Sequence, residues 1–175
     1  NWFKQLRDQI CLELENFENG EKTFKKQRWY RNKNEDLGGG EMSILRGKVF
    51  EKAGVNISTV FGKLSDELKG KIPGTEKSSN FWASGISVVI HPFSPKIPAI
   101  HMNTRFIVTS KTWFGGGCDL TPMINDKKAS TLFHKEIKKM CDRHNKNYYE
   151  DYKLWCDEYF FLPHRNEPRG VGGIF

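Results

Sequence analysis

The sequence has no long hydrophobic run. Among its 175 residues the unbroken apolar stretches are only a few residues long, as in 88–90, whereas a membrane-spanning helix needs roughly 20. Apolar residues make up 37% of the chain and aromatic residues 13%, which is too much for an intrinsically disordered segment. We therefore expect a folded domain that does not insert stably into a membrane.

Cysteine is scarce, and no two cysteines form a CxxC pair. The four residues are scattered along the chain, at Cys11, Cys118, Cys141 and Cys156. This pattern is typical of reduced thiols rather than of a disulfide framework. Because no secretory leader is found either, we expect a cytoplasmic protein.

Several common site motifs are absent. The glycine triplets 38–40 and 115–117 fit neither GxGxxG nor a P-loop, and each is compatible with a tight turn or with close approach of a bulky ligand. No two of the five histidines have HxH or HExxH spacing. A metal site would need distant segments to converge.

No segment is strongly basic. The net charge is +7, with 15 basic and 12 acidic residues in 1–79 and 13 and 9 in 80–175. An ordinary lysine-rich surface explains this balance, although an anionic substrate, or a nucleic-acid-binding module, is also compatible with it. Since no basic arm stands out, we predict that nucleic acid is not a partner.

The first half of the chain predicts one helix followed by strands. Apolar residues at spacings of three and four indicate an amphipathic helix over 2–18. We expect an exposed strand at 23–31 and then a loop that ends in the glycines 38–40. Short strands are expected in 43–61, interrupted at Gly47 and Gly54.

The second half predicts a hairpin followed by helices. Residues 86–91 and 100–108 are apolar strands separated by a proline-rich turn, a spacing that favours antiparallel pairing. A strand at 112–114 is expected to end at the second glycine triplet. Helices follow from Lys127, and the aromatic stripe in 148–161 is expected to pack between helix and sheet.

A polar cluster interrupts the strand at 100–108. Alternation along a strand places His101, Asn103 and Arg105 on one face. Burying such groups without partners is costly, and a guanidinium binds carboxylates through two parallel hydrogen bonds. The cluster indicates an anion-binding cleft, with a solvent-facing strand surface as the alternative.

An aspartate follows the second glycine triplet. Asp119 could accept hydrogen bonds from N–H donors of a ligand, or cap its own turn. We expect Asp119 and Arg105 to lie at a shared cavity. The histidines His91 and His101 close the predicted hairpin and should lie near each other.

Longer segments resemble one family. They are GGGEMSILRGKVFEKAGVNIS at 38–58, ASGISVVIHP at 83–92, HMNTRF at 101–106, WFGGGCDLTP at 113–122 and WCDEYFFLPHRNEPRGVGGIF at 155–175. Together they resemble aerobic, oxygen-dependent coproporphyrinogen III oxidase of haem biosynthesis. The resemblance runs from about Trp2 to the last residue.

The resemblance implies an enzyme that oxidatively decarboxylates two propionates of coproporphyrinogen III to vinyl groups, giving protoporphyrinogen IX. O2 is the co-substrate, and neither a metal nor an organic cofactor is required. The implied fold is α+β, a large antiparallel sheet flanked by helices on both faces, and the implied assembly is a homodimer. Residues 1–175 would form one domain that is incomplete at its C-terminus, so a catalytically inactive, tetrapyrrole-binding fragment is the alternative.

The resemblance also assigns residues. Ser87, Asn103 and Arg105 would bind substrate, with Arg105 on a propionate. His101 would be a proton donor, and Asp119 would contact the pyrrole N–H groups. Metal ligation has been proposed in the family for the positions of His91, His101, His134 and His164.

Overall fold

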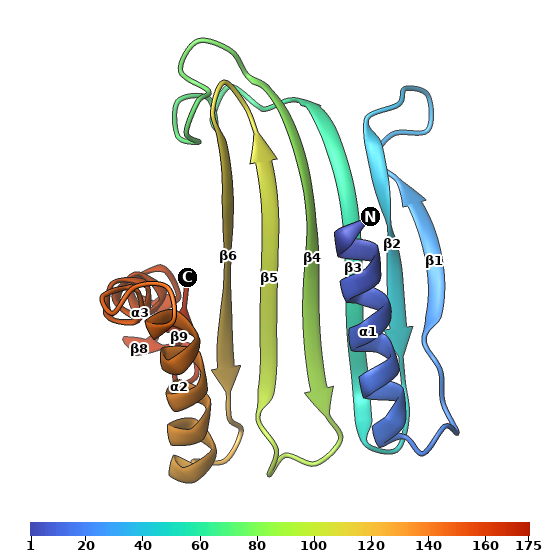
Figure 1. Cartoon of the computed structure of the whole chain (residues 1–175), viewed down its shortest axis with the longest axis vertical. Coiled ribbons are helices and arrows are strands. Elements are labelled where there is room, and N and C mark those ends of the chain that lie inside the picture. Colours follow the sequence, from blue (N-terminus) through green and yellow to red (C-terminus); the bar gives the residue numbers. More distant parts are fainter.

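The computed structural model describes residues 1–175 and contains one large sheet with three helices (Figure 1). In chain order the elements are α1 (Trp2–Phe17), β1 (Lys25–Tyr30), β2 (Gly38–Leu45), β3 (Phe50–Lys63), β4 (Asn80–Pro92), β5 (Ala99–Val108), β6 (Thr112–Thr121), α2 (Lys127–Asp142), α3 (Tyr148–Tyr159), β7 (Phe161–Leu162), β8 (Glu167–Pro168) and β9 (Gly173–Ile174).

The sheet has seven strands in the order β1-β2-β3-β4-β5-β6-β9, and every pair is antiparallel. Strands β7 and β8 form a separate small hairpin. The predicted hairpin of β4 and β5 is confirmed, with Val89 opposite His101 and Ser87 opposite Asn103. The predicted helix at the N-terminus is confirmed as well.

Both glycine triplets lie inside strands, which corrects the predicted boundaries. Residues 38–40 begin β2, 115–117 lie in the middle of β6, and Gly54 is an internal residue of β3. A Cβ on Gly116 would collide with the backbone oxygen of Asn103. Glycines 38–40, 116 and 117 therefore permit close strand pairing, and none of the glycines ends its strand.

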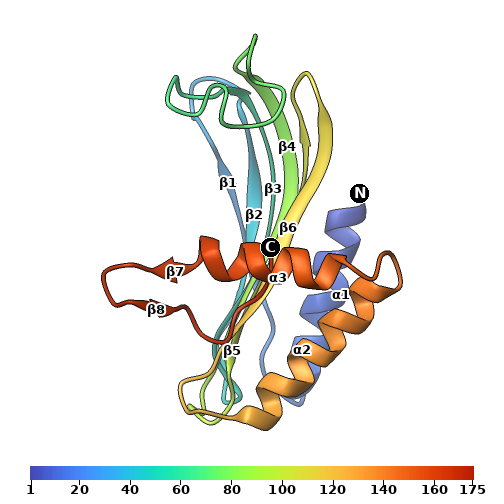
Figure 2. The same ribbon diagram turned by 90° about the vertical axis from the view of Figure 1, so that its left-hand side faces the viewer.

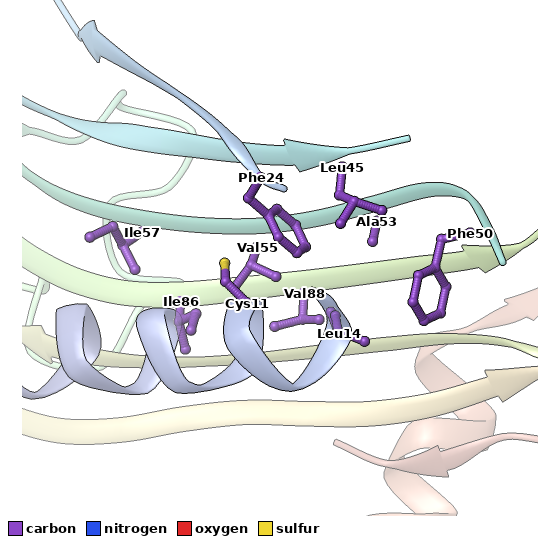
Figure 3. Close-up of a cluster of buried hydrophobic side chains, with 10 residues drawn as sticks. All are labelled: Cys11, Leu14, Phe24, Leu45, Phe50, Ala53, Val55, Ile57, Ile86 and Val88. Carbon is purple, nitrogen blue, oxygen red and sulfur yellow. The ribbon is translucent and has the colours of Figure 1, made fainter. Parts of the chain in front are cut away.

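The main core lies between α1 and the sheet. Side chains of α1 pack against inward-facing residues of β2, β3 and β4, among them the fully buried Leu45 and Val55 (Figure 3). The ten core residues are Cys11, Leu14, Phe24, Leu45, Phe50, Ala53, Val55, Ile57, Ile86 and Val88. Burial of this apolar surface is the main source of stability on this face of the sheet.

A buried carboxylate joins α1 to the same layer. Glu18, which follows the last turn of α1, accepts hydrogen bonds from the backbone N–H groups of Lys48, Val49 and Phe50 at 2.8, 2.9 and 2.8 Å. Burial by itself would raise the pKa of Glu18, but these three donors outweigh it and the pKa is lowered. Glu18 therefore holds the β2–β3 turn as an anion.

The C-terminal helices pack at the other edge of the sheet, against β9 and each other. Tyr149 is buried there, whereas Trp155 and Tyr159 are 56% and 62% exposed. The prediction that the aromatic stripe packs between helix and sheet is thus wrong for these two side chains. Helix α3 packs against the short strand β9 and against α2, and seven of its twelve residues are exposed.

Seen from the side, the two faces of the sheet differ (Figure 2). Helices α1 and α2 lie on one side, α3 crosses beyond the β6 edge, and the β7–β8 hairpin extends toward the other side. The α+β class and the large antiparallel sheet are confirmed. These 175 residues do not form a helical layer over the second face. We call this second face the open face.

Candidate active site

Strand register assembles a polar surface on the open face. Asn56 on β3 is opposite Ser87 on β4, which is opposite Asn103 on β5. Since directly paired residues share a face, these three side chains form a row across the sheet. In the neighbouring row Arg105 lies between Gly85 and Gly115, and the ring of Trp113 lies over Gly115.

A hollow of about 340 Å³ lies over these rows. Its lining includes Ser87, Asn103 and Arg105, the three residues predicted to bind substrate, together with Trp29 and Asn56. Sequence reasoning did not find the last two. For Asn56, the sequence signal that could have been used is the alternation along β3, which places Asn56 on the same face as Gly54 and Ser58.

The polar groups around the hollow retain free hydrogen-bonding capacity. Asn56 Oδ1 accepts from the backbone N–H of Ser43 at 3.3 Å, which leaves its NH2 group available as a donor. Asn103 Oδ1 is buried without a partner, and Arg105 is exposed and forms no ion pair. A guanidinium with adjacent amides and a hydroxyl is suited to binding carboxylate groups.

A second cluster lies further along β5. Asp119 is only 5% exposed, and its Oδ2 lies 3.3 Å from His101 Nδ1 and 3.0 Å from Arg169 Nη2. Burial alone would raise the pKa of Asp119, but the His101 hydrogen bond and the Arg169 charge more than compensate and lower it. The cluster therefore contains an ionised carboxylate between two nitrogen donors.

The two clusters share the open face but not one cavity. His101 and Asn103 are two residues apart on the same face of β5, about 6.6 Å along the strand. Arg105 lines the hollow, whereas Asp119 does not. The expected shared cavity of Arg105 and Asp119 is therefore wrong, and a ligand would have to extend along β5 to contact both.

Comparison with known proteins shows which family the chain belongs to. The family model described as coproporphyrinogen III oxidase matches residues 1–175. The chain belongs to the coproporphyrinogen III oxidase family. The resemblance seen in the sequence segments is confirmed.

Named relatives support this membership along the whole chain. The oxygen-dependent coproporphyrinogen-III oxidases of Rickettsia rickettsii (strain Sheila Smith) and Rickettsia africae are each 52% identical over 183 aligned residues, and that of Rickettsia bellii (strain RML369-C) is 51% identical. Each alignment covers 100% of this chain and 64% of the relative. The chain thus spans just under two thirds of the length of these oxidases.

The metal ligands proposed in the coproporphyrinogen oxidase family are not gathered here. The rings of His91 and His101 are in edge-to-face contact, with centroids 5.7 Å apart. His134 instead bonds the carbonyl of Val171 and the hydroxyl of Tyr149, and His164 lies in the turn of the β7–β8 hairpin. No group of three or more His, Cys, Asp or Glu side chains is arranged to hold a metal ion.

None of the three helices is both long enough and apolar enough to cross a membrane.

Proposed function

We propose that the protein catalyses the oxygen-dependent decarboxylation of coproporphyrinogen III to protoporphyrinogen IX. Each of two propionate side chains, –CH2CH2COOH, reacts with one O2 to give a vinyl group, CO2 and H2O2. Carbon leaves as CO2, and the two electrons and two hydrogens removed from the side chain reduce O2 to H2O2. Membership of the coproporphyrinogen III oxidase family supports this reaction class.

The hollow over β3–β5 is the observation that carries the proposal. Its unpaired Arg105 would hold the carboxylate of a propionate through two hydrogen bonds. The Asn56 amide and the Ser87 hydroxyl would donate to the same or a neighbouring carboxylate, and the unpaired Asn103 oxygen would accept an N–H. Fixing the propionate in this way orients the carbon chain that reacts.

The cluster of His101 and Asp119 would act on the macrocycle. No hydrogen bond or ion pair reaches Asp119 Oδ1. This oxygen would accept a hydrogen bond from a pyrrole N–H or remove its proton. The electron-rich porphyrinogen then reacts with O2 itself, so the proposed mechanism includes neither a metal nor an organic cofactor. His101 would transfer a proton at the reacting side chain.

The direct test is turnover with the reduced substrate. Coproporphyrinogen III is incubated with the protein in air and under nitrogen, the products are oxidised to porphyrins, and they are separated by chromatography. We expect protoporphyrin only in air, with two H2O2 for each protoporphyrinogen formed. Tight binding without vinyl formation, in this chain and in a longer one, would overturn the proposal and favour the inactive, tetrapyrrole-binding fragment.

Asp119→Ala tests the role of the second cluster. We expect turnover to fall by about two to four orders of magnitude, the usual contribution of a positioned acid or base. Retention of wild-type turnover would rule out the proton-transfer role of Asp119. Chemical denaturation of the same variant shows how much of any loss comes from altered folding.

Further features of the family complete the proposal. We infer that residues 1–175 belong to one coproporphyrinogen oxidase domain, that the protein acts as a homodimer and that it works in the cytoplasm without a nucleic-acid partner. Sedimentation of the purified protein would test the dimer.

A further inference from the structure

Asp119 is held by two side chains that come from different parts of the chain. His101 lies opposite it on β5, whereas Arg169 comes from the segment between β8 and β9, fifty residues downstream of Asp119. Both contact the same carboxylate oxygen, Oδ2. An oxygen that accepts hydrogen bonds from two donors is fixed in position, and the two donor side chains are fixed with it.

Arg169 is itself firmly placed. Its guanidinium stacks on the ring of Phe160, 3.7 Å from the centroid, and its Nε is buried without a hydrogen-bond partner. A planar guanidinium can stack on an aromatic ring and donate from its edge at the same time, which an ammonium cannot do. The stack on Phe160 and the ion pair with Asp119 together fix the position of the guanidinium.

The segment after Arg169 is anchored to β6 by backbone hydrogen bonds. Val171 N donates to Leu120 O at 3.0 Å, and Leu120 N donates to Gly172 O at 3.1 Å. His134 Nε2 donates to Val171 O at 2.9 Å and accepts at Nδ1 from the hydroxyl of Tyr149 at 3.0 Å. Helices α2 and α3 therefore support the segment that delivers Arg169 to Asp119.

The contact with Asp119 also determines the state of His101. Because the ionised carboxylate can only accept, Nδ1 of His101 carries the proton in their hydrogen bond. The neutral ring then has its lone pair at Nε2, and no hydrogen bond reaches Nε2 in the structure. The orientation of the ring, and thus of Nε2, depends on where Asp119 lies.

We propose that Arg169 is a positioning residue that acts on His101 through Asp119. Arg169 holds Oδ2, Oδ2 holds Nδ1–H, and Nε2 is thereby directed for proton transfer. The effect of Arg169 on turnover rests on the proposed function, whereas the geometric relation among Arg169, Asp119 and His101 does not.

The experiment compares Arg169→Ala and Arg169→Lys with the control Arg165→Ala. Arg165 precedes Arg169 by four residues, is largely exposed and pairs with Glu167, so its removal changes local charge equally. Steady-state kinetics with coproporphyrinogen III give kcat and KM. In parallel, 15N NMR of the imidazole nitrogens reports the tautomer of His101, at a pH where the ring is neutral.

We expect Arg169→Ala to lower kcat about a hundredfold with little change in KM, the size of effect that a misplacement of about 1 Å produces. Added guanidinium ion should restore part of kcat, and Arg169→Lys should lie between the wild type and the alanine variant. The NMR signals should change from a single tautomer, protonated at Nδ1, to a mixture. Arg165→Ala should match the wild type in every readout.

Unchanged kcat and an unchanged His101 tautomer in Arg169→Ala would overturn the inference. If Arg169→Ala does not fold, Arg169→Lys provides the same test. Lysine lacks the planar guanidinium that stacks on Phe160 and donates to Asp119, so His101 should still populate both tautomers. A tautomer change in Arg169→Ala, together with no wild-type turnover in this chain and in a longer one, would refute the proposed function and leave the positioning role supported.

Discussion

The two faces of the sheet use the same strands for opposite purposes. On the α1 face, side chains such as Leu45, Val55 and Val88 are almost completely buried. On the open face, alternate residues of the same strands are Asn56, Ser87 and other polar or glycine residues that line the hollow.

This difference separates stability from binding. A strand exposes successive side chains on opposite faces, so one strand can contribute to a core and to a site without conflict between the two. Substitutions on the α1 face should therefore change the free energy of unfolding, and those on the open face should change substrate affinity. The following variants test this separation.

Leu45→Ala should give the largest effect. Its side chain is fully buried in the α1 core, so the substitution leaves a cavity and should lower the free energy of unfolding by about 2–5 kcal/mol. Urea denaturation measures this loss. At a temperature where the variant is folded, KM should equal the wild-type value; a large rise in KM would show that the faces are coupled.

Arg105→Ala should give the opposite result. Removing the guanidinium eliminates a charge-assisted hydrogen bond of about 1.5–3 kcal/mol, so KM should rise roughly tenfold to a hundredfold. The unfolding free energy should stay within about 0.5 kcal/mol, as is usual for an exposed residue. A loss of stability comparable to that of Leu45→Ala would contradict the comparison.

Glu18→Gln tests the α1 face with a polar group. A neutral amide satisfies the three backbone donors less well, and we expect a loss of about 1–3 kcal/mol at pH 7. The pKa of Glu18 is lowered by folding, so its contribution is complete above the ordinary value of 4.5 and is lost as the pH falls through the lowered pKa. Denaturation at pH 7 and pH 3 should show that the difference in unfolding free energy between the wild type and Glu18→Gln shrinks in acid. The same difference at both pH values would argue against this role.

Asn56→Ala should have the smallest effect. Loss of one neutral donor at the hollow costs about 0.5–1.5 kcal/mol, so KM should rise severalfold with kcat little changed. The buried backbone N–H of Ser43 also loses its acceptor, which should lower the free energy of unfolding by about 1 kcal/mol. Thr59→Ala is a suitable control, because Thr59 lies on the same strand and bonds Ser84 at an exposed position. An equal rise in KM for both variants would remove Asn56 from the binding surface.

Local patterns predicted the parts of the fold that depend on neighbouring residues. The helix at the N-terminus and the β4–β5 hairpin followed from apolar spacing and a proline-rich turn. The continuous strands β3 and β6 did not, because the low strand propensity of Gly54 and Gly115 is overridden by pairing with neighbouring strands, on both sides of Gly54 and on one side of Gly115.

The site was predictable where its residues belong to one strand. The row His101, Asn103 and Arg105 followed from alternation alone. Asn56 and Arg169 were missed because only strand register and the path of the chain after β8 bring them to the open face. Exposure of Trp155 and Tyr159 could not be foreseen, since it depends on how little of the sheet meets α3.

The burial of the thiols has a consequence for an enzyme that would generate an oxidant. Cys11, Cys141 and Cys156 are buried and Cys118 is partly buried next to Asp119. Loss of solvation raises the pKa of Cys118 to about 12 and those of Cys11 and Cys156 to about 11. Peroxide attacks thiolates rather than thiols, so at neutral pH these side chains would withstand the H2O2 released within the same fold.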